Sequence, residues 1–346
     1  MERITRLCVD ATVLCVLICS LLIVYRVDRG LSNRPVAVGS GPSTPPGATP
    51  AAPLKLAVTA GGYDDMAALL NALGEGYRCT VVTESDLLDS GVPVEFDALF
   101  LTCAERAKDA DATEAKLAKT LRSYVQDGGT LYASDLRFDT LALAFPEVID
   151  RVSVAQGLKQ NLQARVVSPE LHDLLGEEIP LHFDQEGWRP AAFRGKGVTV
   201  DLQGTLRTNA GVEIEAPLLA RFSSGKGTVI FTSFHNEKQV SEIETRLLNH
   251  LVVSTVTAKV EATVTRSMVT GGFSPQRVNL LSSSGGTTPV SQTYDHQGKG
   301  RLIFTLGFEP RGATLRLEVV SPSGETRAVS GDSTVTIDVD DPSEGR

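Results

Sequence analysis

The stretch of sequence that decides the fold is GKGTVIFTSFHNE, residues 225–237. A Gly-Lys-Gly turn leads into a run of apolar and β-branched residues, a pattern typical of a buried β-strand. The run ends at His235 and Glu237, which flank Asn236. Open α/β sheets bind their ligands at the carboxyl ends of the parallel strands. The pattern therefore predicts that His235 and Glu237 lie at the functional edge of such a sheet.

Upstream of this stretch, short apolar runs alternate with segments that are apolar at helical spacing. The runs predict strands over 54–60, 79–83, 96–103 and 128–135, and the spacing predicts helices over 64–73, 113–126 and 140–149. Strands separated by helix-length segments indicate a parallel sheet. We therefore expect an α/β domain over 54–257 with a doubly wound, mostly parallel, flavodoxin-like sheet. Residues 150–220 fit this alternation less well and predict an insertion or an extension of the sheet.

The character of the sequence changes near residue 258. Short alternating runs are divided by Gly, Ser and Pro, as in RLIFTLGF at 301–308, and no helical pattern follows Val253. This pattern predicts a C-terminal all-β sandwich over 258–346.

The N-terminus predicts a membrane anchor. Residues 7–25 read LCVDATVLCVLICSLLIVY, which is long enough as a helix to cross a hydrocarbon core. A cleaved signal peptide is the alternative, but no small-residue cleavage site follows the run. We expect a short tail at 1–6, a transmembrane helix over 7–27 and a Pro/Gly/Ala-rich linker over 28–53. The helix would contact the lipid bilayer, and by analogy with envelope proteins the body would lie on the extracytoplasmic side.

Composition excludes several classes of function. The net charge of -9 over 346 residues leaves no basic face for nucleic acid. The five histidines are dispersed, so no metal-ligand spacing is present, and we expect no metal site. Gly61-Gly62 follows the first strand of the sheet but lacks the pattern of a dinucleotide or phosphate loop, so no cofactor is expected.

The order of these elements resembles the class I glutamine amidotransferase-like fold, particularly its trehalose-utilisation-type relatives, over about residues 54–255. The resemblance rests on FDALFLTC at 96–103, GGTLYASD at 128–135 and GKGTVIFTSFHNE. It implies that His235 and Glu237 are two members of a Cys-His-Glu triad. The family's nucleophilic Cys follows the GGTLYASD-type strand, but this chain has Ser134 and Asp135 there. The C-terminal stretch is similar, more weakly, to pre-peptidase or immunoglobulin-like sandwiches.

Two functions remain open from the sequence. In the first, the chain is a non-catalytic binding or scaffold protein of the cell envelope, with Gly61, Gly62, Asp135 and Asn236 contacting a ligand and the sandwich contacting envelope partners. In the second, it is a hydrolase or amidase. Ser134 or Cys103 would then be the nucleophile that His235 and Glu237 activate. The alternative for each is a purely structural role as a buried residue at the end of a strand.

Overall fold

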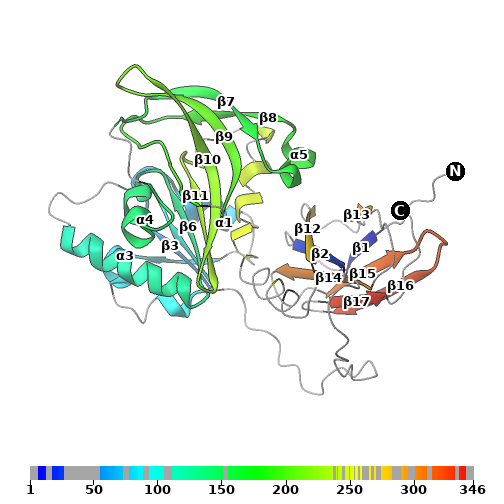
Figure 1. Ribbon diagram of the computed structural model, residues 1–346. Helices are drawn as coiled ribbons and strands as arrows, with labels where there is room; N and C mark the ends of the chain where they lie inside the picture. The colour runs from blue at the N-terminus through cyan, green and yellow to red at the C-terminus, as the bar shows by residue number, and fades with distance from the viewer. Residues whose placement is uncertain are drawn as a thin grey trace. The chain divides into compact units, whose positions relative to one another are not determined.

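The computed structural model describes residues 7–12, 18–26, 55–72, 78–88, 93–104, 111–150, 155–195, 197–236, 239, 241–243, 246–248, 250–252, 254–255, 258, 265, 269, 274–282, 290–294, 301–309, 314–331 and 335–339. They belong to two compact units (Figure 1). The first unit is Leu54–Ala262, and the second combines Met1–Pro53 with Thr263–Arg346.

The first unit is built on a nine-stranded mixed sheet. In spatial order its strands are β4 (Cys79–Val82), β3 (Leu56–Thr59), β5 (Ala98–Leu101), β6 (Thr130–Ser134), β11 (Gly227–Thr232), β10 (Glu213–Ser224), β9 (Val198–Arg207), β7 (Gln160–Val166) and β8 (Glu178–Phe183). The pairings from β4 to β11 are parallel, and those from β11 to β8 are antiparallel. The parallel half has the flavodoxin-like order 2-1-3-4-5, as predicted.

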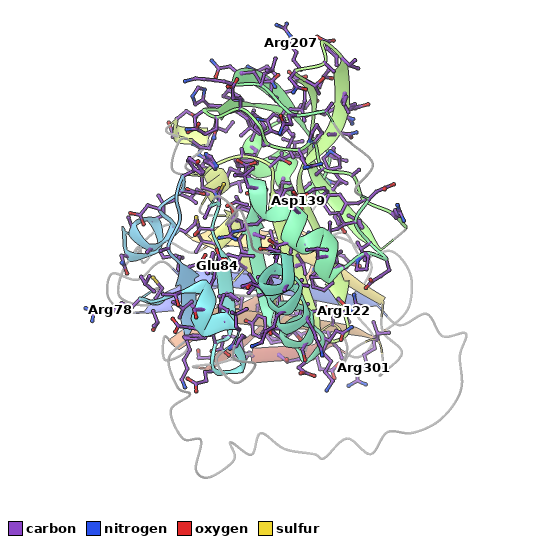
Figure 2. All side chains as sticks on the ribbon, turned by 90° about the vertical axis from the view of Figure 1, so that its left-hand side faces the viewer. Arg78, Glu84, Arg122, Asp139, Arg207 and Arg301 are labelled. Carbon is purple, nitrogen blue, oxygen red and sulfur yellow. The ribbon has the colours of Figure 1, made fainter. Side chains whose placement is uncertain are left out.

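Helices α1 (Met66–Ala72), α2 (Glu84–Leu87), α3 (Asp111–Gln126) and α4 (Phe138–Ala144) accompany the parallel half of the sheet, with 3-10 turns η2 (Pro93–Glu95) and η3 (Asp135–Arg137). Helix α5 (Pro169–Leu175) instead contacts β7 of the antiparallel half. On α3, Leu117, Leu121 and Val125 recur at helical spacing, and all three are buried in one apolar cluster with residues of β5, β6 and β11. α3 and α4 lie side by side on one side of the sheet in Figure 1. Arg122 of α3, labelled in Figure 2, donates to Ala144 O at 2.6 Å and so ties the two helices together.

For residues 150–220 the sequence predicted either an insertion or an extension of the sheet. The structure shows an extension, because these residues supply strands of the antiparallel half. β10 and β11 form the predicted hairpin, with Gly225 at φ +59° in its turn. The register of β10 against β9 shifts between Pro217 and Ala220. A β-bulge of this kind bends a strand and increases its twist. Arg207, labelled in Figure 2, stands at the end of β9.

The second unit is all-β. Its sheets have the orders β13-β1-β15-β16 and β12-β2-β14-β17, and every pairing in them is antiparallel. The strands are β1 (Leu7–Thr12), β2 (Ile18–Arg26), β12 (Ser274–Ser282), β13 (Val290–Gln292), β14 (Leu302–Glu309), β15 (Thr314–Val320), β16 (Thr326–Gly331) and β17 (Val335–Val339). The unit therefore draws strands from both ends of the chain, which the predicted boundary at residue 258 did not include.

The structure differs from the predicted transmembrane helix over 7–27. Residues 7–12 and 18–26 are strands β1 and β2, paired with strands from the C-terminal part of the chain. An apolar run does not distinguish a buried strand from a helix by periodicity, and the Val, Ile and Thr content of this run favours strands. Within the described residues, no helix is both long enough and apolar enough to span a bilayer. Bilayer contact and an extracytoplasmic location stay predictions.

Other predicted boundaries also moved. α4 ends at Ala144, ahead of Pro146, rather than continuing to residue 149. Residues 254, 255, 258, 265 and 269 are helical, beyond the predicted last helical residue Val253. The β-branched content of 254–269 hides the helical pattern. The tail at 1–6 and the linker at 28–53 lie outside the described residues.

We predict that Gly225→Ala destabilises the first unit more than Gly211→Ala. Both glycines have positive φ, +59° and +73°, so both variants incur left-handed strain of about 1–2 kcal/mol. A Cβ on Gly225 would also lie 2.6 Å from the Gln126 backbone, whereas nothing lies within 4 Å of a Cβ on Gly211. Urea unfolding followed through Trp188, the single tryptophan, should show an additional loss of about 1–3 kcal/mol. Equal losses would contradict this packing.

Candidate functional site

The site begins with a sharp turn after β6. Asp135 follows the strand at φ +46°, and it is the non-glycine residue with positive φ among those that the structure describes. The chain then enters η3 and α4. Left-handed backbone costs a non-glycine residue energy, and such residues cluster at functional sites. A strained strand-to-helix turn is also the geometry that presents a nucleophile in many hydrolases. Here the presented group is a carboxylate.

Arg137 holds this turn in place. Its side chain is 1% exposed, and Nε donates to Thr102 O at 2.8 Å. Its guanidinium also forms an ion pair with Glu84, which is labelled in Figure 2. The turn is therefore joined to the carboxyl end of β5, whose next residue, Thr102, exchanges hydrogen bonds with Thr59 at the end of β3. Three neighbouring strand ends form one rigid frame.

His235 lies at the centre of the site with a carboxylate at each ring nitrogen. Nδ1 is 2.8 Å from Asp184 Oδ1, and Nε2 is 2.9 Å from Asp135 Oδ2. The Nε2 contact departs from hydrogen-bond direction, since Nε2 makes no aligned hydrogen bond with any described residue. The three side chains are nearly enclosed, with 2%, 12% and 6% of the His235, Asp184 and Asp135 side chains exposed. The Tyr63 ring lies parallel to the imidazole at 6.0 Å between ring centroids.

Asp184 reaches His235 although β8 and β11 are separated in the sheet by three other strands. Gln239 connects the two segments. It accepts from His182 N at 3.0 Å and donates to His182 O at 2.8 Å and to His235 O at 2.9 Å. The bent antiparallel half of the sheet thus brings the end of β8 back to the carboxyl edge of the parallel half.

Burial, the Asp135 carboxylate and Cys103 together determine the pKa of the His235 ring. Burial lowers the pKa of His235, but the Asp135 carboxylate, together with Cys103, outweighs burial and raises that pKa to about 11. Burial raises the pKa of Asp135, and the adjacent imidazole offsets only part of this effect. The raised pKa favours the imidazolium form of the ring, in which both nitrogens are donors.

Cys103 joins this group, whereas Ser134 does not. Cys103 Sγ lies 3.6 Å from Asp135 Oδ2, and Cys103 Sγ, one Asp135 carboxylate oxygen and one His235 ring nitrogen all lie within 4.8 Å of one another. The Ser134 side chain is fully buried, and its Oγ accepts the Cys103 N–H at 3.1 Å. Burial raises the pKa of the Cys103 thiol. Ser134 thus supports the strand end.

Asn236, which we predicted to contact a ligand, makes its hydrogen bonds within the protein. It is 2% exposed, its N–H donates to Asp64 Oδ2 at 3.1 Å, and its side chain donates to Tyr132 Oη. It therefore joins the end of β11 to the turn before α1. Glu237 lies outside the described residues, and Asp184 occupies the orienting position on His235 Nδ1 that the resemblance gave to Glu237.

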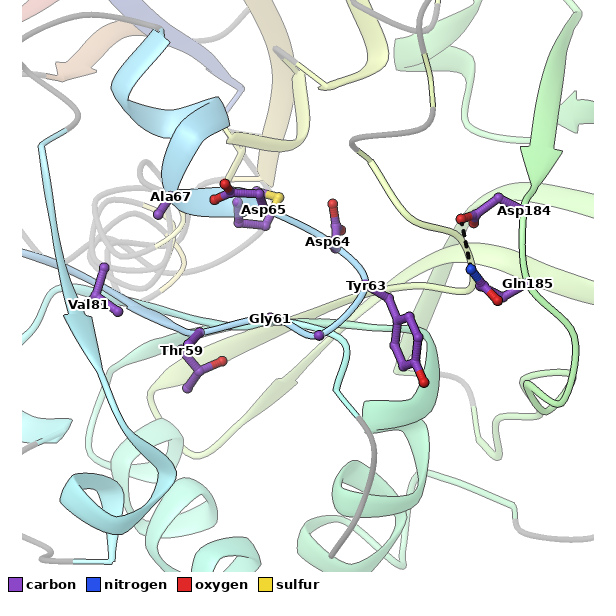
Figure 3. Close-up of a pocket in the computed structure, with 12 residues that line it drawn as sticks. Thr59, Gly61, Tyr63, Asp64, Asp65, Ala67, Val81, Asp184 and Gln185 are labelled. Atoms are coloured by element: carbon purple, nitrogen blue, oxygen red, sulfur yellow. Dashed lines mark hydrogen bonds between the residues drawn. The ribbon is translucent and has the colours of Figure 1, made fainter.

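A pocket of ≈ 460 Å³ lies next to this centre (Figure 3). Its wall contains Gly61 and Gly62 of the loop after β3, and Gly62 N donates to Cys103 O at 2.9 Å. The other lining residues are Thr59, Ala60, Tyr63, Asp64, Asp65, Met66, Ala67, Val81, Asp184 and Gln185. Because Asp184 contacts both the pocket and His235, the pocket is coupled directly to the buried centre.

Sequence reasoning brought His235, Cys103, Asp135 and the Gly61-Gly62 loop to one edge but did not include Asp184 in the site. Asp184 lies within residues 150–220, the stretch that fits the alternation of strands and helices less well. The available signal was an Asp directly after a strand, since strand ends are where α/β sheets carry functional groups. That β8 curls back to His235 could not be read from the sequence.

No protein-family model matches the chain, and no curated protein matches its sequence. Similar solved structures include a putative GMP synthase component from Thermoplasma acidophilum, with 14% identity, a TM-score of 0.42 and coverage of 62% of this chain and 98% of that one. A glutamine amidotransferase from Thermotoga maritima shows 10% identity and a TM-score of 0.36, with coverage of 60% and 96%. One from Methylobacillus flagellatus shows 16% identity and a TM-score of 0.34, with coverage of 57% and 75%. The structural neighbours thus include glutamine amidotransferase-like folds at low identity.

We predict that Asp135→Gly leaves the first unit about 1 kcal/mol more stable than Asp135→Ala. Both variants remove the carboxylate, but only glycine adopts φ +46° without strain. At Asp139 in α4, where the backbone is helical, the order should reverse, because glycine destabilises a helix by roughly 0.5–1 kcal/mol relative to alanine. Urea unfolding of the four variants measures both differences. An Ala variant that is the more stable at both positions would show that Asp135 carries no backbone strain.

Proposed function

We propose that the α/β unit is a binding domain for a small polar ligand that is neutral or cationic, and that it lacks the covalent acyl-transfer chemistry of glutamine amidotransferases. The observation that carries this proposal is the placement of His235 between Asp135 and Asp184, beside a pocket of ≈ 460 Å³. The volume suits a small molecule.

The chemistry of the centre supports a non-covalent role. A general base must have a free nitrogen to accept a proton, and an imidazolium with a pKa of about 11 has none at neutral pH. The Ser134 hydroxyl is occupied by the Cys103 N–H, and the Cys103 thiol is fully buried. Neither side chain is therefore activated for attack on a substrate.

The wall of the pocket favours a ligand without negative charge. Three aspartates line it, namely Asp64, Asp65 and Asp184, and the Tyr63 ring contributes an aromatic surface (Figure 3). Carboxylates repel anions, whereas an aromatic ring next to carboxylates suits an amine or another cation. The wider role as an envelope scaffold, with partners on the all-β unit, stays a prediction from the sequence.

A hydrolase is the second candidate, because Cys103 lies in the same cluster as His235. In that case Cys103 would have to lose its proton to a neighbouring base and attack the substrate through Sγ. The two candidates differ in the reactivity of this thiol in the folded protein.

We predict that iodoacetamide modifies Cys79 but not Cys103 in the folded chain, because Cys79 is partly exposed and Cys103 is buried. Peptide mass mapping separates the two sites, and labelling in urea shows that both thiols are competent. The glutamine analogue 6-diazo-5-oxo-L-norleucine should leave Cys103 unmodified as well. Labelling of Cys103 by the analogue in the wild type, lost in His235→Ala, would establish the hydrolase instead.

We predict that a polyamine such as spermidine raises the melting temperature of the wild type, whereas citrate does not. Val81 is a 59% exposed pocket residue, so Val81→Trp should fill the pocket and abolish the shift without disturbing the core. Val212, 53% exposed, lies outside the pocket wall, and Val212→Trp is the matched control that retains the shift. A ligand at 100 times its Kd stabilises by about 2.7 kcal/mol, which is readily measured. An equal shift with citrate, or a shift retained in Val81→Trp, would contradict the proposed ligand class or its site.

A further inference from the structure

Three side chains with metal-binding atoms converge at the carboxyl edge of the sheet. Cys103 follows β5, Asp135 follows β6 and His235 follows β11, so neighbouring parallel strands deliver all three. Their exposed fractions are 0%, 5% and 2%, and one ligand atom from each lies within 4.8 Å of the others. The ligands of a tetrahedral zinc ion lie about 3.3–3.8 Å apart, given bond lengths of roughly 2.0–2.3 Å. Small side-chain movements would suffice to reach that geometry.

Two buried polar atoms of this group have no hydrogen-bond partner among the described residues. They are His235 Nε2 and Asp135 Oδ1. A buried polar atom without a partner costs about 1–3 kcal/mol, so each one calls for an explanation. Once His235 Nε2 has lost its proton, a cation between the imidazole and the carboxylate would satisfy both atoms at once.

The surroundings of the three residues match those of metal ligands. A metal-bound histidine normally directs its second nitrogen at a carboxylate or carbonyl, which fixes the ring and its tautomer. Asp184 Oδ1 lies 2.8 Å from His235 Nδ1. The Cys103 backbone is held in turn through the Ser134 hydroxyl. The contact that orients the His235 imidazole and the hydrogen bond that holds the Cys103 backbone are thus already formed.

We propose that Cys103, Asp135 and His235 bind one zinc ion. A thiolate, an imidazole and a carboxylate form a donor set that suits zinc, whereas calcium and magnesium require oxygen-rich sites. Binding displaces the thiol proton of Cys103 and the Nε2 proton of His235 to solvent. The thiolate and carboxylate then balance the two positive charges of the ion. Three protein ligands leave a fourth position for water or a ligand, as in open zinc sites.

This inference goes beyond the proposed function, because none of the three zinc ligands lines the pocket in which the small molecule would bind. Zinc binding can fail while spermidine still stabilises the protein, and the reverse also holds. The two proposals are therefore tested separately.

The first test is cobalt substitution of the full-length chain after removal of metals with a chelator. Co²⁺ should bind with one equivalent per chain and give a near-ultraviolet thiolate-to-cobalt charge-transfer band with visible bands of tetrahedral cobalt. Cys103→Ser should lose the charge-transfer band. A variant in which the other four cysteines are serine should retain it, which excludes Cys8, Cys15, Cys19 and Cys79 as the sulfur donor. Competition with a chromophoric chelator should show a roughly 10–100-fold weaker zinc affinity in Asp184→Asn.

The second test needs no substitution and so does not depend on how well a variant folds. Zinc X-ray absorption of the wild type should show one sulfur at about 2.3 Å and nitrogen or oxygen neighbours at about 2.0–2.2 Å. A zinc spectrum without sulfur, one with two or more sulfurs, or failure of the metal-free protein to take up stoichiometric zinc would overturn the proposal. So would a charge-transfer band that survives in Cys103→Ser.

Discussion

The two carboxylates on His235 are the interaction on which the rest of the site depends. Asp135 comes from the parallel half of the sheet and Asp184 from the far end of the antiparallel half, so the imidazole joins the two halves. Burying a charge is costly unless it is paired, and a cationic ring between two carboxylates meets that condition. The rigid frame around Arg137 and the curled strands up to β8 both serve to place these partners.

Much of the first unit could be predicted from residue patterns. The parallel strands, the β10–β11 hairpin and α3 all followed from short-range periodicity and turn residues, because local sequence determines them, and the order of the parallel strands followed from the expected flavodoxin-like fold class. Position at the carboxyl edge likewise brought His235, Cys103 and Asp135 together. Asp184 was missed, because its contact with His235 depends on the bend of four antiparallel strands. The strands at 7–12 and 18–26 were missed because their partners lie about 250 residues away or more.

The chemistry of the site follows from what stands at the turn after β6. The strained residue at this turn is Asp135, and Cys103 lies one strand away, just after the end of β5. Cys103, Asp135 and His235 thus place three polar groups around a common point. In the account proposed above, these three groups hold a cation, and the adjoining pocket holds a ligand.

The placement of His235 between two carboxylates is tested most directly by the nitrogen-15 NMR spectrum of its ring in the metal-free protein at neutral pH. The ring signals are assigned by comparison with His235→Gln. The account predicts that both ring nitrogens carry protons, because each faces a carboxylate. A neutral ring with one unprotonated nitrogen would contradict the placement of His235 between Asp135 and Asp184.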